Sequence, residues 1–190
     1  MAALNVVALS GSLREKSYNT ALLREAVRLA PAGMTIDIAS IRDIPLYDAD
    51  LEARAFPAAV DSLSDRVRQA AALLIATPEY NFSIPGVLKN TIDWLSRPPR
   101  DAALVRKPVA IMGAGGRLGS ARAQYHLRQV CACLSMLLLP RPEVFILAAW
   151  EKFSADGRIN NEADEKQIRD LLAALSDWTH LLKRGHASGS

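Results

Sequence analysis

Polar side chains able to donate hydrogen bonds are concentrated in residues 10–20, which read Ser-Gly-Ser-Leu-Arg-Glu-Lys-Ser-Tyr-Asn-Thr. This segment follows an apolar run of strand length and precedes apolar residues at helical spacing. A loop in that position aims backbone N–H groups and the positive end of a helix dipole at one point. The candidate side-chain donors are Ser10, Ser12, Arg14, Ser17 and Asn19. Because a phosphate monoester removed from water needs many donors, the segment predicts a phosphate-binding loop.

The same residues also fit an ordinary polar loop between a strand and a helix, with a serine as the N-cap, because Ser and Gly are common turn residues. The segment has neither the G-x-G-x-x-G spacing nor the G-x-x-x-x-G-K-[ST] spacing. A dinucleotide-binding Rossmann site and a P-loop nucleotidase are therefore disfavoured.

A second polar segment, residues 77–90, reads Thr-Pro-Glu-Tyr-Asn-Phe-Ser-Ile-Pro-Gly-Val-Leu-Lys-Asn. Pro78 and Pro85 stiffen its two ends, because the proline ring fixes φ. Between them, Tyr80 and Phe82 alternate with polar side chains, a mixture that suits the edge of a flat heteroaromatic ring. The alternative is a rigid turn whose two aromatic rings pack on the core.

Short apolar runs alternate with helical periodicities along the chain, and this pattern predicts the elements that position both segments. Strands are expected at 4–9, 35–39, 71–76, 108–112 and 143–147. Helices are expected at 18–30, 57–71, 85–96 and 118–134, with a last helix capped by Asn161. Residues 42–56 are expected to form an irregular surface loop.

The first, third and fourth of these strands are almost continuously apolar, as in a parallel sheet covered on both faces. With right-handed crossovers the pattern predicts an α/β fold, a three-layer sandwich. Residues 1–184 are expected to form one domain and 185–190 a flexible tail. In such sheets ligands bind at the carboxyl ends of the strands, where both polar segments are placed.

Taken together, S-G-S-L-R-x-x-S-x-N after the first strand and T-P-E-Y-N-x-S-x-P-G-x-L-K-N after the third resemble the NADPH-dependent FMN reductase family. That family includes bacterial quinone and chromate reductases and some azoreductases. A third segment, G-A-G-G-R-L-G at 113–119, also fits, and the resemblance covers about residues 4–182. It implies a flavodoxin-like, five-stranded parallel sheet of order 2-1-3-4-5.

The resemblance also implies the residues that bind FMN. The phosphate would be held by Ser10, Ser12, Arg14, Ser17, Asn19 and Thr20. The ring would be lined, largely by backbone groups, by Pro78, Glu79, Tyr80 and Asn81. Its other side would be closed by Gly113, Ala114, Gly115 and Gly116, where the glycines allow close approach. Lys16 stands where many relatives carry a small residue, and we expect it to alter the affinity for the phosphate slightly.

The implied activity is an FMN-dependent NAD(P)H oxidoreductase acting on quinones, chromate, azo compounds or free flavin, without a catalytic side chain, because the cofactor carries the chemistry. No motif for the adenosine side separates NADPH from NADH. The alternatives are a non-catalytic flavodoxin-like electron carrier or redox-sensing module, and an unliganded structural domain. The net charge of +3 and Arg14 favour the enzyme, because flavodoxins are usually strongly acidic and have a different phosphate loop.

Members of the family are dimers or tetramers with the flavin near a subunit interface. Arg122, Tyr125 and Glu143 match positions that form a network between subunits in some chromate-reducing relatives. The alternative is that these residues lie on a solvated helix face. The resemblance thus implies a homodimer or homotetramer.

Composition excludes several other classes of protein. With 50% hydrophobic and 23% charged residues the chain is expected to fold, and it shows no basic stripe for nucleic acid. We expect no membrane span, no signal peptide and no metal site. We interpret Trp94, Trp150 and Trp178 as packing residues. Cys131 and Cys133 are too close in sequence for a good disulfide, which indicates a reducing, cytoplasmic location.

Overall fold

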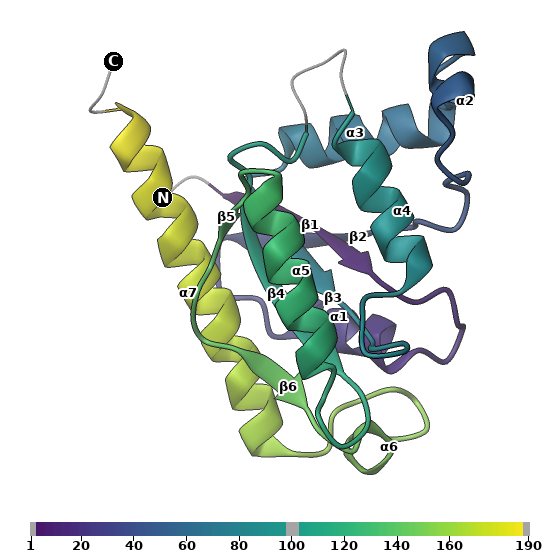
Figure 1. Cartoon of the computed structure of the whole chain (residues 1–190). Helices are drawn as coiled ribbons and strands as arrows, with labels where there is room; N and C mark the ends of the chain where they lie inside the picture. The colour runs from purple at the N-terminus through teal and green to yellow at the C-terminus, as the bar shows by residue number, and fades with distance from the viewer. Residues whose placement is uncertain (1–2, 98–102, 188–190) are drawn as a thin grey trace.

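The computed structural model describes residues 3–97 and 103–187. Its sheet consists of β1 (Leu4–Ser10), β2 (Met34–Ala39), β3 (Ala72–Ala76), β4 (Pro108–Ala114), β5 (Leu137–Leu138) and β6 (Val144–Ile146). The strands are parallel and follow the order β2-β1-β3-β4-β5, with β6 also paired to β4 (Figure 1). The predicted order is confirmed. This order puts the switch point, where successive strands go to opposite sides, between β1 and β3.

The edge of the sheet beyond β4 differs from the prediction of five strands. β5 pairs with the start of β4 at Pro108 and Val109, and β6 pairs with its end at Met112, Gly113 and Ala114. The predicted fifth strand, 143–147, is therefore β6. β5 was missed because two residues are too short to show a period.

The helices are α1 (Tyr18–Arg28), α2 (Ala49–Arg54), α3 (Ala58–Gln69), α4 (Gly86–Leu95), α5 (Ala121–Cys133), α6 (Ala149–Lys152) and α7 (Glu162–Ala187). The five predicted helices are present, and Asn161 accepts a hydrogen bond from Asp164 N–H as the N-cap of α7. The irregular loop predicted at 42–56 contains α2, whose N-cap is Asp48. α7 runs beyond the expected start of the tail, and 188–190 lie outside the described residues.

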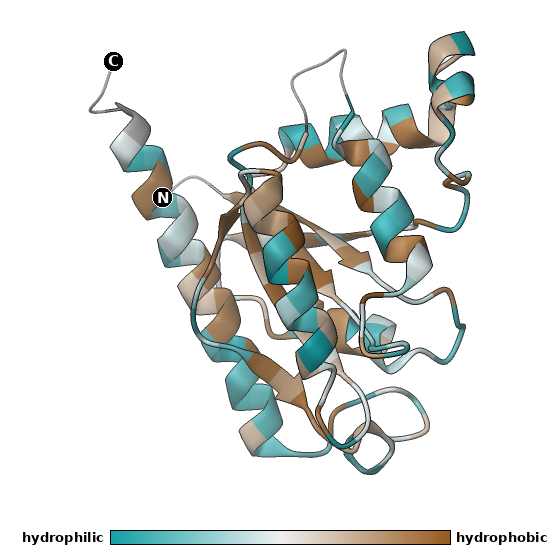
Figure 2. Ribbon diagram, viewed as in Figure 1, coloured by the Kyte–Doolittle hydropathy of each residue, from teal (hydrophilic) through white to brown (hydrophobic). Residues whose placement is uncertain are grey.

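Helices cover both faces of the sheet, so the three-layer prediction is confirmed. In β1, Val6 and Ala8 pack toward α1 and α7, while Val7 and Leu9 pack toward α3, α4 and α5. Figure 2 shows the consequence: the strands are hydrophobic and the helices carry hydrophilic residues outward. In the described part of the chain no helix is long and apolar enough to cross a bilayer.

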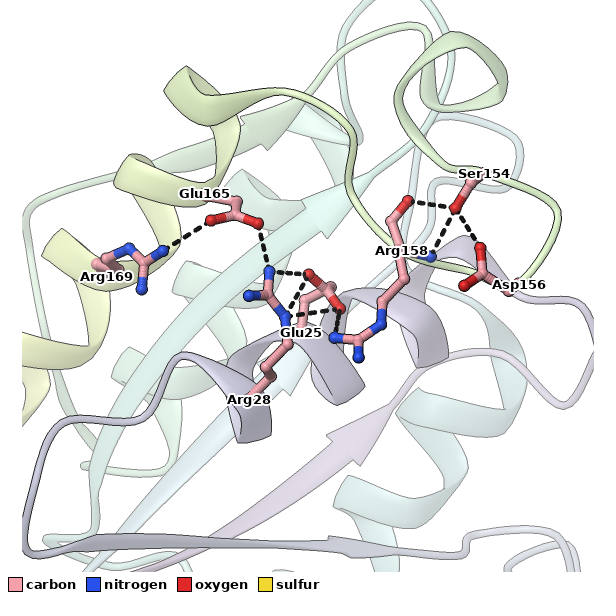
Figure 3. Close-up of polar contacts among 7 residues, drawn as sticks. All are labelled: Glu25, Arg28, Ser154, Asp156, Arg158, Glu165 and Arg169. Atoms are coloured by element: carbon pink, nitrogen blue, oxygen red, sulfur yellow. Dashed lines mark hydrogen bonds and ion pairs between the residues drawn. The ribbon is translucent and has the colours of Figure 1, made fainter.

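A cluster of ion pairs joins α1 to α7 and to the loop that precedes α7 (Figure 3). Glu25, whose side chain is 2% exposed, accepts hydrogen bonds from Arg28 at 3.1 Å and from Arg158 at 3.2 Å. Glu165 at the start of α7 pairs with Arg28 and Arg169. One buried carboxylate thus fixes the position of three segments on the same face of the sheet.

Candidate functional site

A cleft of about 530 Å³ lies at the carboxyl edge of the sheet. Its walls come from the loops after β1, β3 and β4 and from α6, which lie in the lower part of Figure 1. Most of the predicted site residues line it: Ser12, Arg14, Ser17, Asn19, Pro78, Glu79, Tyr80, Ala114, Gly115 and Gly116. The topology thus brings together three segments that are far apart in the sequence.

The loop after β1 forms the most polar wall of this cleft. Ser17 is the N-cap of α1, and its Oγ accepts the backbone N–H of Thr20 at 3.3 Å. The backbone N–H of Arg14 donates to Ser12 Oγ at 3.3 Å. Amides in the first turn of a helix have no intrahelical acceptor, so the N-terminus of α1 favours an anion, although Ser17 Oγ already accepts the amide of Thr20. The guanidinium of Arg14 lies 5.4 Å from the ring centre of Tyr18, which also lines the cleft.

Asn19 is placed at the cleft but does not offer a free amide. Its Nδ2 donates to the carbonyl of Ala114 at 2.9 Å, and its Oδ1 accepts the N–H of Ala114 at 3.0 Å. This pair of hydrogen bonds joins the start of α1 to the end of β4. The sequence could not reveal this role, because the partner lies 95 positions away.

Ser10, Thr20, Asn81 and Gly113 do not line the main cleft. Ser10 Oγ lies 2.9 Å from Thr20 Oγ1, and both residues line a neighbouring cleft. A Cβ on Gly113 would stand 1.9 Å from Ser120 Oγ. The missing side chain of this glycine is therefore required by packing beneath the cleft rather than by the approach of a ligand.

The loop after β3 ends in a tight two-residue turn. Two backbone hydrogen bonds of 3.0 Å join Tyr80 and Ser83, and Asn81 and Phe82 between them have positive φ values of 50° and 66°. A positive φ is unusual for an aromatic residue, so this turn is held by its surroundings. The guanidinium of Arg122 lies 3.7 Å from the ring centre of Phe82.

Glu79 connects that turn to the helix after β4. Its Oε2 accepts the backbone N–H groups of Arg122 at 3.0 Å and Ala123 at 3.4 Å, so it caps α5. Its other oxygen pairs with the Arg122 guanidinium. Both carboxylate oxygens therefore have partners within the protein, so we expect a ligand to contact the backbone of Glu79.

The residues predicted to meet at a subunit interface have separate partners within one chain. Arg122 pairs with Glu79, and Glu143 pairs with Arg128 and Arg141. Tyr125 is half exposed and packs beside Phe145, with ring centres 6.5 Å apart. One chain alone therefore does not build the expected network.

Trp150 was wrongly interpreted as a packing residue. Its side chain is 57% exposed and lines the cleft, where it faces Gly116. Trp94, by contrast, is buried. A signal in the sequence was available, because Trp150 comes soon after a strand, and ligand sites in such sheets gather there. In the described residues no group of three potential metal ligands is found.

The cleft therefore combines a wall rich in charge and hydroxyl groups with a wall of aromatic side chains and glycines. Arg14, Ser12 and Ser17 supply charge and hydroxyl groups at the first, and Tyr80 and Trp150 supply aromatic surface at the second. The glycines of the third loop add no bulk, since a Cβ on Gly116 would meet only Trp150. These donors and walls fit FMN. An α/β sandwich of this strand order with a mononucleotide cleft at its switch point defines the flavodoxin-like class.

Within that class, the chain belongs to the NADPH-dependent FMN reductase family, whose sequence model matches residues 4–151. It is 49% identical to an "NAD(P)H-dependent FMN reductase" of Pseudomonas aeruginosa over 181 residues, which cover 95% of this chain and 97% of the relative. It is 50% identical to a "Quinone reductase" of Escherichia coli (strain K12) over 184 residues, which cover 95% and 96%. These relatives confirm the resemblance stated from the sequence.

Among solved structures, the chain is similar to FerB, a flavoenzyme NAD(P)H:(acceptor) oxidoreductase from Paracoccus denitrificans. The TM-score is 0.86 at 35% identity, with 94% of this chain and 98% of that chain covered. A flavodoxin from the domain Archaea has a TM-score of 0.62 at 11% identity, covering 93% and 100%, and shows the fold alone.

Proposed function

We propose that this protein is an FMN-dependent NAD(P)H oxidoreductase that reduces small electron acceptors, quinones among them. One observation carries the proposal: a single cleft is lined by a cation, by the N-terminus of a helix and by two aromatic rings. These are Arg14, the first turn of α1, Tyr80 and Trp150. The names of its relatives, which are reductases and not electron carriers, support the enzyme over the carrier.

The residues of the cleft bind and orient. Ser12, Arg14 and Ser17 would hold the phosphate of FMN, with Arg14 supplying paired guanidinium hydrogen bonds. The backbone at Pro78–Tyr80 and the glycines of the third loop would hold its ring. When bound, FMN supplies two-electron transfer from a nicotinamide to an acceptor, so no side chain has to act as acid, base or nucleophile.

The rim of the cleft supports flat aromatic acceptors. Tyr80 and Trp150 are more than half exposed, and Phe82, in the same turn as Tyr80, is 63% exposed. Flat rings gain both apolar burial and stacking on such surfaces. Quinones, azo compounds and free flavin contain flat rings that can stack there. Chromate is an oxyanion without such a ring, so we expect it to be a poorer acceptor.

An NAD(P)H oxidation screen across acceptors, with the flavin content measured in the same preparation, tests the proposal. We expect protein loaded with one FMN per chain to oxidise NADPH or NADH when a quinone is present. Protein with a full complement of FMN that oxidises neither nucleotide with any acceptor would contradict it.

We also propose that the protein works as a homodimer or homotetramer in the cytoplasm. The exposed Tyr125, on the same helix that carries Arg122 to the cleft, supports an interface next to the site. The cytoplasmic location rests on Cys131 and Cys133, which form no disulfide in the structure.

A further inference from the structure

A second cleft, of about 260 Å³, lies on the other side of the phosphate loop from the aromatic wall of the main cleft. We call it the arginine cleft, and its walls come from residues 10–15, from α1 and from the segment that follows β2. Ser12 and Arg14 line both this cleft and the main one. The two clefts are therefore adjacent, and a ligand in one can contact the same arginine as a ligand in the other.

The arginine cleft carries excess positive charge. Arg14, Arg24 and Arg42 line it, and Glu15 is the one acidic residue among the lining residues. In the part of the chain that the structure describes, no ion pair is formed by these three arginines, whereas Arg28, on the same helix as Arg24, pairs with two carboxylates. Like charges that converge without a counter-charge repel, and an anion between them relieves the repulsion.

The arginine cleft is also held in shape by hydrogen bonds. The Nη2 of Arg42 donates to the carbonyl of Leu13 at 2.7 Å, so the segment after β2 is attached to the phosphate loop. The backbone N–H of Arg42 donates to Ser40 Oγ at 3.2 Å. A guanidinium has five N–H donors, so Arg42 keeps most of its donors for a ligand. The hydroxyls of Ser10 and Thr20 line the same cleft.

We propose that the arginine cleft binds the 2′-phosphate of NADPH and that Arg24 and Arg42 give the enzyme a preference for NADPH over NADH. The inference rests on the proposed function, because it places the nicotinamide of the same molecule in the main cleft. A 2′-phosphate is a phosphate monoester, which guanidinium groups bind with charge-assisted, paired hydrogen bonds. NADH has a hydroxyl at that position and cannot make these contacts.

Binding of nucleotide fragments without any electron transfer tests this assignment. The FMN-loaded protein is titrated by calorimetry with 2′,5′-ADP and with 5′-AMP. We expect 2′,5′-ADP to bind at least about tenfold more tightly, since one charge-assisted hydrogen bond is worth roughly that factor. The double variant Arg24→Ala/Arg42→Ala should bind both fragments alike, and Arg42→Lys should keep part of the difference. The matched control is Arg54→Ala, an exposed arginine on α2 outside the cleft, which should change nothing.

Steady-state kinetics separate this inference from the proposed function. In Arg24→Ala, which leaves the Arg42–Leu13 hydrogen bond in place, we expect the KM for NADPH to rise about tenfold toward that for NADH, with kcat for NADH unchanged. Equal binding of the two fragments by the unaltered protein would overturn the assignment. So would loss of FMN by Arg24→Ala alone, which leaves the Arg42–Leu13 hydrogen bond in place, because the arginine cleft would then hold the FMN phosphate. In either case continued oxidation of NADH by the unaltered, FMN-loaded protein leaves the proposed function standing.

Discussion

Trp150 and Arg14 show how single side chains define the cleft. One is an exposed aromatic ring on α6, and the other an exposed guanidinium on the loop after β1. Among the described residues, Trp150 Nε1 donates to its neighbour Glu151, and Arg14 contacts the ring of Tyr18. These contacts do not explain why both side chains face the cleft. Exposed residues of these two kinds in one cleft indicate stacking and charge recognition of a ligand.

Trp150→Phe tests the aromatic wall. Trp94 is buried and Trp178 packs on the core, so Trp150 should provide most of the tryptophan fluorescence that bound FMN quenches. We expect FMN added to the apoprotein to quench the variant far less. Trp150→Ala should also weaken FMN binding about fivefold, because stacking contributes about 1 kcal/mol. Trp178→Phe is the control and should retain the quenching; equal quenching in all three proteins would remove Trp150 from the site.

The place of a candidate site residue could be predicted where residue type and loop position alone decide it, and its role toward a ligand stays a prediction. Ser12, Arg14 and Ser17 lie where the loop pattern placed them. Asn19 and Gly113 could not be understood in the same way, because their roles depend on Ala114 and Ser120, which reach them only in the folded chain. The sequence shows which donors and acceptors a loop contains. Tertiary contacts decide which of them remain available to a ligand.

At the scale of elements, the loops are held by helix termini. Glu79 caps the N-terminus of α5, and Ser17 caps that of α1. The ammonium of Lys107, the residue before β4, donates to a carbonyl at the C-terminal end of α3. The long strands could be predicted because helices cover both faces of the sheet. Residues on both sides of such a strand are apolar, so the strand appears in the sequence as a continuous apolar run. β5 and α6, with two and four residues, are too short to show any period. α6 is the element that carries Trp150, so this miss also hid a site residue.

Lys107 gives a pH-dependent prediction. Its ammonium is buried and donates to the carbonyls of Arg68 at 3.1 Å and Ala70 at 2.6 Å. Burial, and then repulsion by Arg68 and Lys183, lower the pKa of Lys107 from 10.5 to about 8. Between these two values the unfolded chain binds more protons than the folded one, so the free energy of unfolding rises with pH in that window.

Urea unfolding of the protein and of Lys107→Met at pH 7.5 and 9.5 checks this. We expect the stability of the protein relative to the variant to increase by about 2 kcal/mol between the two pH values. Parallel pH dependences of the two proteins would show that Lys107 keeps an ordinary pKa in the fold.

At the scale of the whole molecule, Glu25 fixes one layer of the sandwich. Its buried carboxylate accepts hydrogen bonds from Arg28 and Arg158, and through Arg28 the cluster reaches Glu165 on α7. Glu25→Gln keeps the shape but leaves both guanidinium groups without a buried counter-charge. We expect a loss of about 2 to 3 kcal/mol in the free energy of unfolding. The more exposed Glu165→Gln should lose less than about 1 kcal/mol, and equal losses would contradict a special role for Glu25.

The oligomer can be tested apart from the cleft. Arg122 is unsuitable as the only probe, because Arg122→Ala also breaks its contacts with Glu79 and Phe82. We expect Tyr125→Ala to shift the mass measured by light scattering toward the monomer while FMN binding persists. An unchanged mass for Tyr125→Ala and for Arg122→Ala would place the interface elsewhere or show that none exists.

The central claim is that the whole molecule delivers electrons from a nicotinamide to an acceptor through FMN in the main cleft. Rapid mixing of the FMN-loaded protein with NADPH under anaerobic conditions tests it most directly. We predict that the visible absorbance of the flavin is lost within one turnover and returns when a quinone is added. Absorbance that stays unchanged after mixing with NADPH and with NADH would contradict the claim and favour an electron carrier.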